Sequence, residues 1–407
     1  RKPQRAPLVR YAMRGATAAL AWQLFLACVP APAKAADEHR RLFLDQRVIE
    51  KSENVHVTIG TVKKHPANPL FSEDKPWEMR FDNLYANVIY DEQEKIYKCW
   101  YSPFIVDNSS RDIAVEDRKN THYYKAPYNR EMGICYAVSA DGLKWTKPEM
   151  GLVEYEGSKA NNILWRGTGP GVENEWFGPH GTGIFKDLRD PDPERRYKAI
   201  LKRDILSVAF SPDGIRWDTT HSCPEADSAG DTHNNAFWAP TLGRYVGITR
   251  QWDDAENVRQ VAVTYSDDFI RWSKSEVVLQ GITANHQVYA MPVFYYAGVY
   301  LGLAAIHDQT SDRVWTELTW SADTRKWHRI SPGTPLIGND GKEGDYDWGC
   351  VYSAATPVIL NDEIRIYYGS SDGKHHGWRN GHFCLATLRP DGWAGMEPRS
   401  PDDPGYV

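Results

Sequence analysis

A short cassette of strands and turns recurs five times along the chain. Its clearest copy runs from Asp231 to Trp272, with apolar runs at 236–238, 245–248 and 261–265 separated by a tight turn and a polar loop. Runs this short, rich in β-branched and aromatic residues and joined by turn residues, are typical of antiparallel β-strands. The repeat constrains the fold more than any other feature because each copy is one supersecondary unit that must stack on its neighbours.

The end of the cassette carries the motif Ser-x-Asp-x-x-x-Trp. It begins at Ser139, Ser211, Ser266 and Ser321, and a degenerate fifth copy spans Thr387 to Trp393. We interpret the motif as structural, a hairpin turn followed by a packing tryptophan. Outside the first cassette, which carries an insertion, the spacing is that of a four-stranded propeller blade. We therefore predict an all-β fold, a five-bladed β-propeller of four-stranded antiparallel blades.

The two ends of the repeat region are incomplete in a complementary way. The segment 41–50 alternates apolar and polar residues outside any cassette, and the fifth cassette lacks a fourth strand after Trp393. We predict that 42–49 pairs into the last blade and closes the ring, which removes an exposed sheet edge. Residues 36–397 are then one domain, and the Pro/Asp-rich residues 398–407 are a loose tail.

The first 35 residues predict a signal peptide. They contain six Lys or Arg and no Asp or Glu, followed by an apolar stretch at 16–29 and the small residues around Lys34. This pattern is typical of a secretory signal cleaved near Ala35, and the apolar stretch is too short to span a bilayer. We expect a secreted or periplasmic protein with no membrane association after signal removal. The oligomeric state is left open.

The net charge limits the classes of binding partner, and the cysteine content indicates whether disulfides are expected. Without residues 1–35 the chain has 42 basic and 54 acidic residues, a net charge of −12 with neutral histidines. Such a balance argues against nucleic acid as a partner. Five cysteines remain, an odd number without a CxxC pair, and four of them lie in predicted strands. We expect buried free thiols rather than a disulfide framework.

Loop length distinguishes two faces of the predicted propeller. In an antiparallel blade, the segment before the first strand and the loop between the second and third strands lie on the same face. On this long-loop face the connections are long and polar, at 102–132, 250–257, 307–313 and 370–380. The connections on the opposite, short-turn face are tight turns. Binding and catalytic residues concentrate on elaborated loops over a rigid scaffold, so we place the site on the long-loop face.

Residues just before each innermost strand converge on the axis at that face. Three blades bring a carboxylate, which makes Asp82, Asp231 and Asp347 the candidate catalytic residues. The candidate substrate-binding residues around them are Arg80, Glu175, Trp176, His180, His233, Asn234, Arg250, Trp252, His286, Gln287, Tyr352 and His375. Glycoside cleavage needs one protonated and one ionised carboxyl, and crowding carboxyls in a cavity moves their pKa values apart. Tryptophans at the rim can stack on sugar rings.

The chain resembles the five-bladed β-propeller glycoside hydrolases of the family 32/43-like superfamily, and is most similar to uncharacterised secreted family 32-like propellers. The resemblance covers 42–393 and is carried by Leu42 to Glu50, Ser139 to Trp145, Met291 to Val293 and Ile366 to Gly369. It implies an aspartate that is nucleophile or base, for which Asp82 stands, and a supporting aspartate, for which Asp231 stands. The family's inner-rim acid is a glutamate. This chain has no glutamate there, so the acid is Asp347 or, from nearby loops, Glu343 or Glu175.

We therefore expect a secreted glycoside hydrolase that acts on a plant, algal or microbial oligosaccharide or polysaccharide. Two alternatives stay open. One is a non-catalytic glycan-binding propeller, favoured by the missing glutamate. The other is a metal-dependent enzyme with His180, His233, His286 and His375 or His376 as ligands, although no HxH or HExxH spacing supports it. No cofactor is expected unless rim His and Asp side chains hold a central cation.

Overall fold

The computed structural model describes residues 40–107, 130–167, 176–402 and 404–407. The chain divides into two compact units, 1–30 and 31–407, and every described element belongs to the second. The predicted signal peptide lies outside the described residues, so both it and the secreted location stay predictions. Within the described ranges no helix is long and apolar enough to cross a membrane. The helices there are the short 3-10 turns η1 (Gln46–Val48), η2 (Pro193–Arg195) and η3 (Pro224–Ala226).

Strands form five blades that follow the cassettes, with antiparallel pairing between successive strands of each blade. The first is β4 (Asn87–Asp91), β5 (Ile96–Tyr101), β7 (Arg130–Ser139) and β8 (Ile163–Arg166), with β6 (Phe104–Asp107) and β9 (Trp176–Phe177) added to the start of β7. The second is β10 (His180–Lys186), β11 (Tyr197–Lys202), β12 (Leu206–Ser211) and β13 (His221–Ser222). The third is β14 (Asn235–Ala239), β15 (Arg244–Asp253), β16 (Val258–Ser266) and β17 (Glu276–Leu279).

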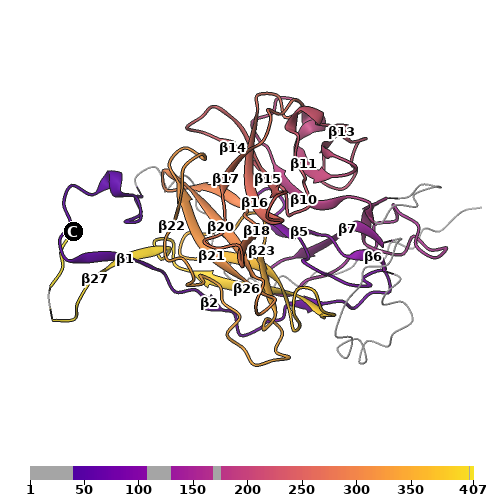
Figure 1. Ribbon diagram of the computed structural model, residues 1–407. Helices are drawn as coiled ribbons and strands as arrows, with labels where there is room; N and C mark the ends of the chain where they lie inside the picture. The colour runs from indigo at the N-terminus through magenta and orange to yellow at the C-terminus, as the bar shows by residue number, and fades with distance from the viewer. Residues whose placement is uncertain (1–39, 108–129, 168–175, 403) are drawn as a thin grey trace, which may run out of the picture. The chain divides into compact units, whose positions relative to one another are not determined.

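The last two blades, which belong to one continuous sheet, have a divided innermost strand. The fourth is β18 (His286–Ala290) with β19 (Val293–Tyr296), then β20 (Val299–Asp308), β21 (Arg313–Ser321) and β22 (Trp327–Arg329). The fifth is β23 (Cys350–Ser353) with β24 (Val358–Ile359), then β25 (Ile364–Ser371), β26 (Gly381–Leu388) and the N-terminal strands β2 (Lys63–Lys64) and β3 (Phe71–Ser72). A separate pair is β1 (Val55–Ile59) with β27 (Ala394–Pro398), seen side by side in Figure 1.

Strands of successive blades contact one another in sequence around a ring. β4 contacts β10, β10 contacts β14, and β14 contacts β19; β20 then contacts β23, and β24 returns to β4. Asn87 of β4 shows how the contact is made: its side chain donates to the Thr182 carbonyl at 2.8 Å and accepts from the Ile184 amide at 2.8 Å. The all-β propeller prediction is confirmed, and the order of these contacts fits five blades.

Ring closure uses a different part of the N-terminal segment from the one predicted. β2 and β3 pair with β26, through Lys63 with Thr387 and Phe71 with Phe383. The prediction that 42–49 is the closing strand is wrong. Leu42 and Leu44 are buried in a hydrophobic cluster with residues of the fourth and fifth blades, and η1 follows them. The alternating apolar residues Leu42 and Leu44 therefore anchor this segment to the core by their side chains, and the segment is not a strand.

The C-terminal residues, predicted to be a loose tail, bond to the segment that precedes β1. The backbones of Glu53 and Tyr406 exchange two hydrogen bonds of 3.0 Å, and the Tyr406 hydroxyl donates to the Glu53 carboxylate at 2.6 Å.

The Ser-x-Asp-x-x-x-Trp motif forms the hairpin turn between the third and fourth strands. In the first copy the Ser139 hydroxyl donates to Asp141 at 3.0 Å, and the same carboxylate oxygen accepts the amides of Leu143 and Lys144 at 2.8 Å. The indole of Trp145 donates back to the Gly142 carbonyl. The bonds to the aspartate recur in the copies that begin at Ser211, Ser266 and Ser321. The motif is structural, as the sequence indicated.

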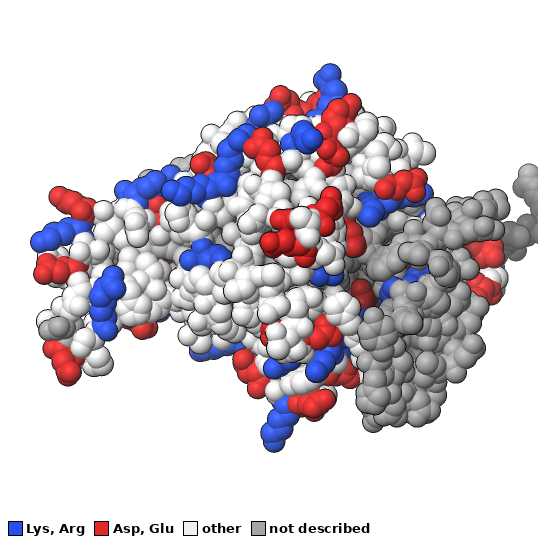
Figure 2. All heavy atoms as spheres, in the orientation of Figure 1, with Lys and Arg blue, Asp and Glu red and all other residues white. Residues whose placement is uncertain are grey.

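The described cysteines are buried, and charged side chains of both signs lie at the surface. All five cysteines in the described part of the chain are buried free thiols, which confirms the expectation. Basic and acidic side chains are interspersed on the face drawn in Figure 2.

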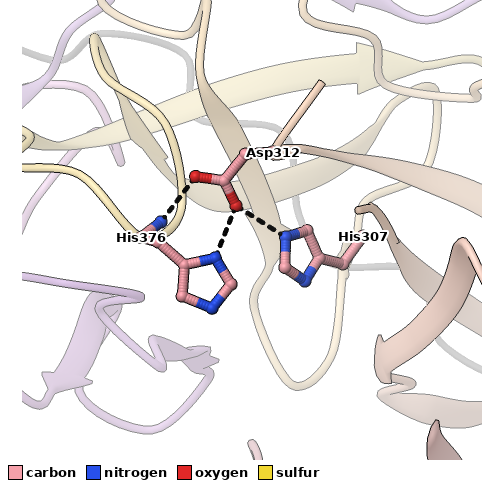
Figure 3. A group of neighbouring side chains, drawn as sticks. All are labelled: His307, Asp312 and His376. Carbon is pink, nitrogen blue, oxygen red and sulfur yellow. Dashed lines mark hydrogen bonds and ion pairs between the residues drawn. The ribbon is translucent and has the colours of Figure 1, made fainter. Parts of the chain in front are cut away.

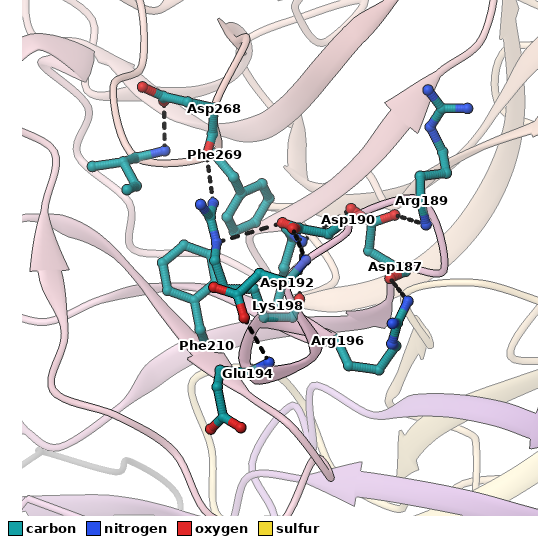
Figure 4. A network of polar contacts seen from close by, with 12 residues as sticks. Asp187, Arg189, Asp190, Asp192, Glu194, Arg196, Lys198, Phe210, Asp268 and Phe269 are labelled. Atoms are coloured by element: carbon teal, nitrogen blue, oxygen red, sulfur yellow. Dashed lines mark hydrogen bonds and ion pairs between the residues drawn. The ribbon is translucent and has the colours of Figure 1, made fainter.

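Buried charges tie the blades together on the short-turn face (Figure 4). The ammonium of Lys198, in β11, lies 3.0 Å from Asp187 and 2.7 Å from Asp190, and its side chain is fully buried. The Tyr245 hydroxyl from the third blade donates to Asp187 at 2.6 Å. We call Lys198, Asp187, Asp190 and Tyr245 the Lys198 network. It joins the second and third blades.

Candidate functional site

The segment that leads into β4 has an unusual backbone. Asp82, Leu84 and Tyr85 have φ values of 53°, 63° and 44°, in the left-handed region. Residues other than glycine rarely occupy this region, and clusters of them concentrate at functional sites. The segment therefore marks the start of the first inner strand as a constrained position, and it carries the first predicted carboxylate.

Asp82 is held between two buried guanidinium groups. Arg80 and Arg379 donate to the same carboxylate oxygen, Oδ1, at 2.8 and 2.6 Å. Burial is the largest influence on the pKa of Asp82 and would raise it, but the charges of Arg379 and Arg80 outweigh burial and the pKa is lowered. The side chain is 10% exposed. Asp82 is therefore ionised and mostly enclosed.

Asp231 is the more accessible carboxylate. Its Oδ1 lies 2.8 Å from the Nε2 atom of His180, and its Oδ2 lies 3.4 Å from Arg250. Burial would raise the pKa of Asp231, yet the hydrogen bond to His180 and the charges of His180 and Arg250 bring it well below its usual value. The side chain is 40% exposed. Asp231 is therefore an ionised group that a ligand can reach.

A layer of polar aromatic side chains connects the two carboxylates. Asn83 donates to the hydroxyls of Tyr85 and Tyr289 at 2.9 Å each. The Tyr85 ring packs edge-on to His180 with centroids 5.5 Å apart, and the Arg250 guanidinium lies 4.5 Å from the Tyr289 ring. We call the whole group the central cluster: Arg80, Asp82, Asn83, Tyr85, His180, Asp231, Arg250, Tyr289 and Arg379. Its members come from the segments before β4 and β14, from strands β10, β15 and β18, and from the loop between β25 and β26, so all five blades contribute.

A polar side cavity of about 380 Å³ adjoins the central cluster. Its lining includes Trp252, Arg259, Gln287, Gln309 and His376. The Arg259 guanidinium lies 4.8 Å from the Trp252 ring and 5.3 Å from the Tyr289 ring, and it donates to Gln287 at 2.8 Å. Two predicted binding residues, Trp252 and Gln287, thus share one cavity, whose volume is in the range of small-molecule sites.

Tyr352 and His375 lie beside the central cluster. The Tyr352 hydroxyl is 2.7 Å from the Nδ1 atom of His375, whose ring centroid is 4.7 Å from that of Tyr289. Burial lowers the pKa of His375 well below its usual value, so its imidazole is neutral.

Two predicted residues have contacts away from the central cluster. Asp347 is buried against Lys64 of the closing strand β2 at 2.8 Å, with the Tyr368 hydroxyl at 3.3 Å. These contacts place it in the outer part of the last blade rather than against Asp82 or Asp231. His286 lies 3.8 Å from Asp308, on its own blade.

Of the remaining predicted residues, two are buried in the packed interior and two have side chains outside the described part of the structure. Asn234 is fully buried, and its amide donates to the carbonyls of Gly181 and Gly230 at 3.1 and 2.9 Å, which fixes the backbone there. His233 packs against Tyr85, and burial lowers its pKa to about 3. Glu175 lies outside the described residues, and the structure gives only the backbone of Trp176, in β9.

Arg379, Arg259 and Glu73 are among the residues of the site that were not predicted from the sequence. Arg379 and Arg259 lie in or next to the long loops, and that position was the only signal for them. Glu73 precedes the first cassette, so no repeat position marked it. Its carboxylate accepts the amides of Phe81 at 2.7 Å and Gly381 at 3.1 Å, beside the central cluster, and burial raises its pKa to about 8.

Comparison with known proteins identifies the fold. No protein-family model matches the chain, and no curated protein matches its sequence. A glycosyl hydrolase from Bacteroides ovatus superimposes with a TM-score of 0.56 at 14% identity, covering 84% of this chain and 98% of that one. A putative glycosidase from Bacteroides thetaiotaomicron gives 0.54 at 16%, covering 81% and 97%. A putative glycoside hydrolase from Parabacteroides distasonis gives 0.54 at 15%, covering 82% and 97%. The chain therefore shares its β-propeller fold with these solved structures.

Proposed function

We propose that the protein is a glycan-processing enzyme that cleaves a glycosidic bond at the central cluster. The observation that carries the proposal is the pair of ionised carboxylates, Asp82 and Asp231, brought by two different blades to the same aromatic layer. Glycosidases place two carboxyl groups around the scissile bond in this manner. The solved structures of similar fold are named glycosyl hydrolases and glycosidases, which supports the same class.

The surroundings of the two aspartates favour different roles. Asp231 is the better exposed, at 40% against 10%, so we assign it the sugar face, as nucleophile or base. Asp82 has both arginines on one oxygen and suits electrostatic support of the cationic transition state. This assignment exchanges the two roles that the family resemblance implied.

The proton for the leaving oxygen must come from a third group because both aspartates are ionised. We propose Glu73, since it keeps its proton near neutral pH and lies one hydrogen bond from the residue before Asp82. A general acid matters most when the leaving group is poor. We therefore expect Glu73→Gln to lose turnover on natural glycosides but to keep most of it on substrates with an activated aryl leaving group. Equal losses on both substrate types would remove Glu73 from this role.

Arg259 indicates the substrate class. Within the described ranges it has no carboxylate partner, and burial lowers its pKa. A guanidinium in a cavity wall with an aromatic neighbour suits a sugar that carries a carboxylate or a sulfate. We propose an acidic glycan as substrate and expect Arg259→Gln to raise KM for acidic oligosaccharides far more than for neutral ones.

The test is a turnover screen on neutral and acidic oligosaccharides with wild type, Asp231→Asn and Asp218→Asn. Asp218 is a matched control because it also pairs with a histidine, His221, at 3.1 Å on the surface of the second blade. We expect Asp231→Asn to reduce kcat by several powers of ten with sugar affinity nearly intact, and Asp218→Asn to behave as wild type. If the wild type binds glycans but does not turn them over, the protein is a non-catalytic glycan-binding propeller and the proposed enzymatic function is wrong. Normal turnover in Asp231→Asn would remove Asp231 from catalysis.

A further inference from the structure

Three side chains of the types that bind metal ions meet where the long loops of the fourth and fifth blades come together (Figure 3). His307 lies near the end of β20, Asp312 in the turn between β20 and β21, and His376 in the loop between β25 and β26. Two imidazoles and one carboxylate are the ligand set of many catalytic zinc and non-haem iron sites. None of the three takes part in the central cluster.

The donor atoms already have separations close to those around a metal ion. The Oδ1 atom of Asp312 is 2.9 Å from Nε2 of His307 and 2.7 Å from Nδ1 of His376. One donor atom from each residue lies within 4.8 Å of the others. An ion with bonds of about 2.1 Å holds adjacent donors roughly 3 Å apart, so only a small rotation of one side chain is needed. His376 has that freedom because its side chain is 50% exposed.

The surrounding hydrogen bonds fix the three ligands without using up their donor atoms. The backbone amide of His376 donates to Oδ2 of Asp312 at 2.9 Å, and the amide of His375 donates to the Asp312 carbonyl at 2.9 Å. Both bonds anchor the fifth-blade loop to the Asp312 turn. The Gln309 amide contacts Nδ1 of His307 at 2.7 Å, on the ring nitrogen away from the proposed ion. Such outer contacts orient the ligands of protein metal sites.

The group also faces open space. His376 and Gln309 both line the side cavity that contains Trp252 and Arg259, whereas His307 is fully buried behind them. A site with three protein ligands and one side open to a cavity has the coordination of a catalytic or ligand-binding metal rather than that of a closed structural one.

We propose that His307, Asp312 and His376 bind one divalent transition-metal ion of the zinc class, with its free coordination position directed into the side cavity. The set differs from the rim histidines considered from the sequence. His180 is committed to Asp231, His233 is enclosed by packing, and only His376 is common to both sets. If the proposed function holds, an oxygen of an acidic sugar would bind the ion while Arg259 contacts the same anionic group.

The experiment measures ion binding to tag-free protein stripped with chelator, without substrate. Zn²⁺ is titrated calorimetrically, and Co²⁺ is added to follow its visible absorption bands, which report nitrogen and oxygen ligands. The proteins are wild type, Asp312→Asn, His376→Ala and His221→Ala. His376→Ala changes an exposed loop side chain, so its fold is expected to survive, and His221→Ala removes the histidine of a surface His–Asp pair elsewhere.

We expect one Zn²⁺ per chain for wild type and for His221→Ala, and loss of that binding event in Asp312→Asn and His376→Ala. Gln309→Ala should weaken binding about 10- to 100-fold, as expected for an outer contact. Wild type that takes up no stoichiometric ion would overturn the proposal, as would undiminished uptake by His376→Ala. Because no glycan is present, either failure leaves the proposed glycosidase untouched, and an inactive glycosidase with intact ion binding leaves the metal site in place.

Discussion

The central cluster and the Lys198 network are both groups of buried charge, but their carboxylates are used differently. In the network every carboxylate oxygen is bonded: Asp187 accepts Tyr245, Lys198 and the Arg189 amide, and Asp190 accepts Lys198 and the Asp192 amide. In the central cluster Asp82 receives both arginines on one oxygen, within the part of the chain that the structure describes, and Asp231 stays 40% exposed.

The difference separates a structural role from a functional one. A buried carboxylate whose oxygens are all bonded within the protein offers little to a ligand, and removing one partner costs several kcal/mol. A carboxylate held ionised by flanking cations, with an oxygen left over, is poised to interact with a charge that develops in a substrate. Two features distinguish the central cluster from the network: Asp82 is bonded through one oxygen in the described part of the chain, and Asp231 is 40% exposed although both of its oxygens have partners.

The largest expected effect compares Asp82→Asn with Asp187→Asn. On a glycan that the wild type cleaves, Asp82→Asn should reduce kcat by several powers of ten, because the neutral amide gives no electrostatic support to the transition state. Asp187→Asn should keep the kcat of its folded fraction and lower the stability. Steady-state kinetics with thermal denaturation measures both. A catalytic defect in Asp187→Asn equal to that of Asp82→Asn would erase the distinction between the regions.

Removing the ammonium of the network should have the largest effect on stability. Lys198→Met leaves the buried Asp187 without its cation and Asp190 with Arg195 alone, at 3.4 Å, and we expect a loss of about 3–5 kcal/mol in the free energy of unfolding. Arg216→Met is the control, since the Arg216–Asp213 pair is 72% and 37% exposed, and it should change stability by less than about 0.5 kcal/mol. Urea denaturation compares the two. Similar losses for both variants would mean that Lys198 is not essential to its network.

Glu73, beside the central cluster, should make the stability of the protein depend on pH. Its pKa is raised from 4.5 to about 8 in the folded state, so between these values the folded protein keeps a proton that the unfolded chain has lost. Stability therefore falls as pH rises through this window, and Glu73→Gln removes the fall. We expect the variant to gain about 1–2 kcal/mol on wild type between pH 5 and 8. Glu92→Gln, at an exposed turn, is the control, and parallel pH curves for wild type and Glu73→Gln would contradict the assignment.

The smallest effect concerns the hairpin turns. Burial would raise the pKa of Asp268, but the amides of Arg271 and Ile270 and the Arg271 side chain lower it to about 2. A depressed pKa gives stability that is present above the unfolded value of 3.8 and is lost as pH falls through 2. We expect Asp268→Asn to cost about 1 kcal/mol at pH 6 and nothing below pH 2, measured by urea denaturation with activity unchanged. If Asp268→Asn remains less stable than wild type below pH 2, the turn depends on the hydrogen-bonding geometry of the aspartate rather than on its charge.

Short-range sequence patterns were sufficient to predict the propeller fold because each blade is built mainly from residues that are close in the chain. Strand runs, turns and the Ser-x-Asp-x-x-x-Trp motif are short-range features, and they recovered the sheets, the structural role of the motif and the buried thiols. The same reasoning failed at 42–49, where two buried leucines in a non-strand segment have the spacing of a strand. Which segment closes the ring depends on pairing with β26, more than 300 residues away in the chain.

The sequence by itself also determined that Asp82, His180, Asp231 and Arg250 would converge, since each lies at or near the start of an inner strand or in a long loop, and the propeller brings such positions to one axis. Only the tertiary structure placed Asp347 against Lys64, set Arg379 beside Asp82, raised the pKa of Glu73 and brought His307 to His376. The physical reason is that partner identity and burial are properties of contacts between distant segments. A repeat pattern fixes where a side chain enters the fold, but the loops of other blades decide what it meets there.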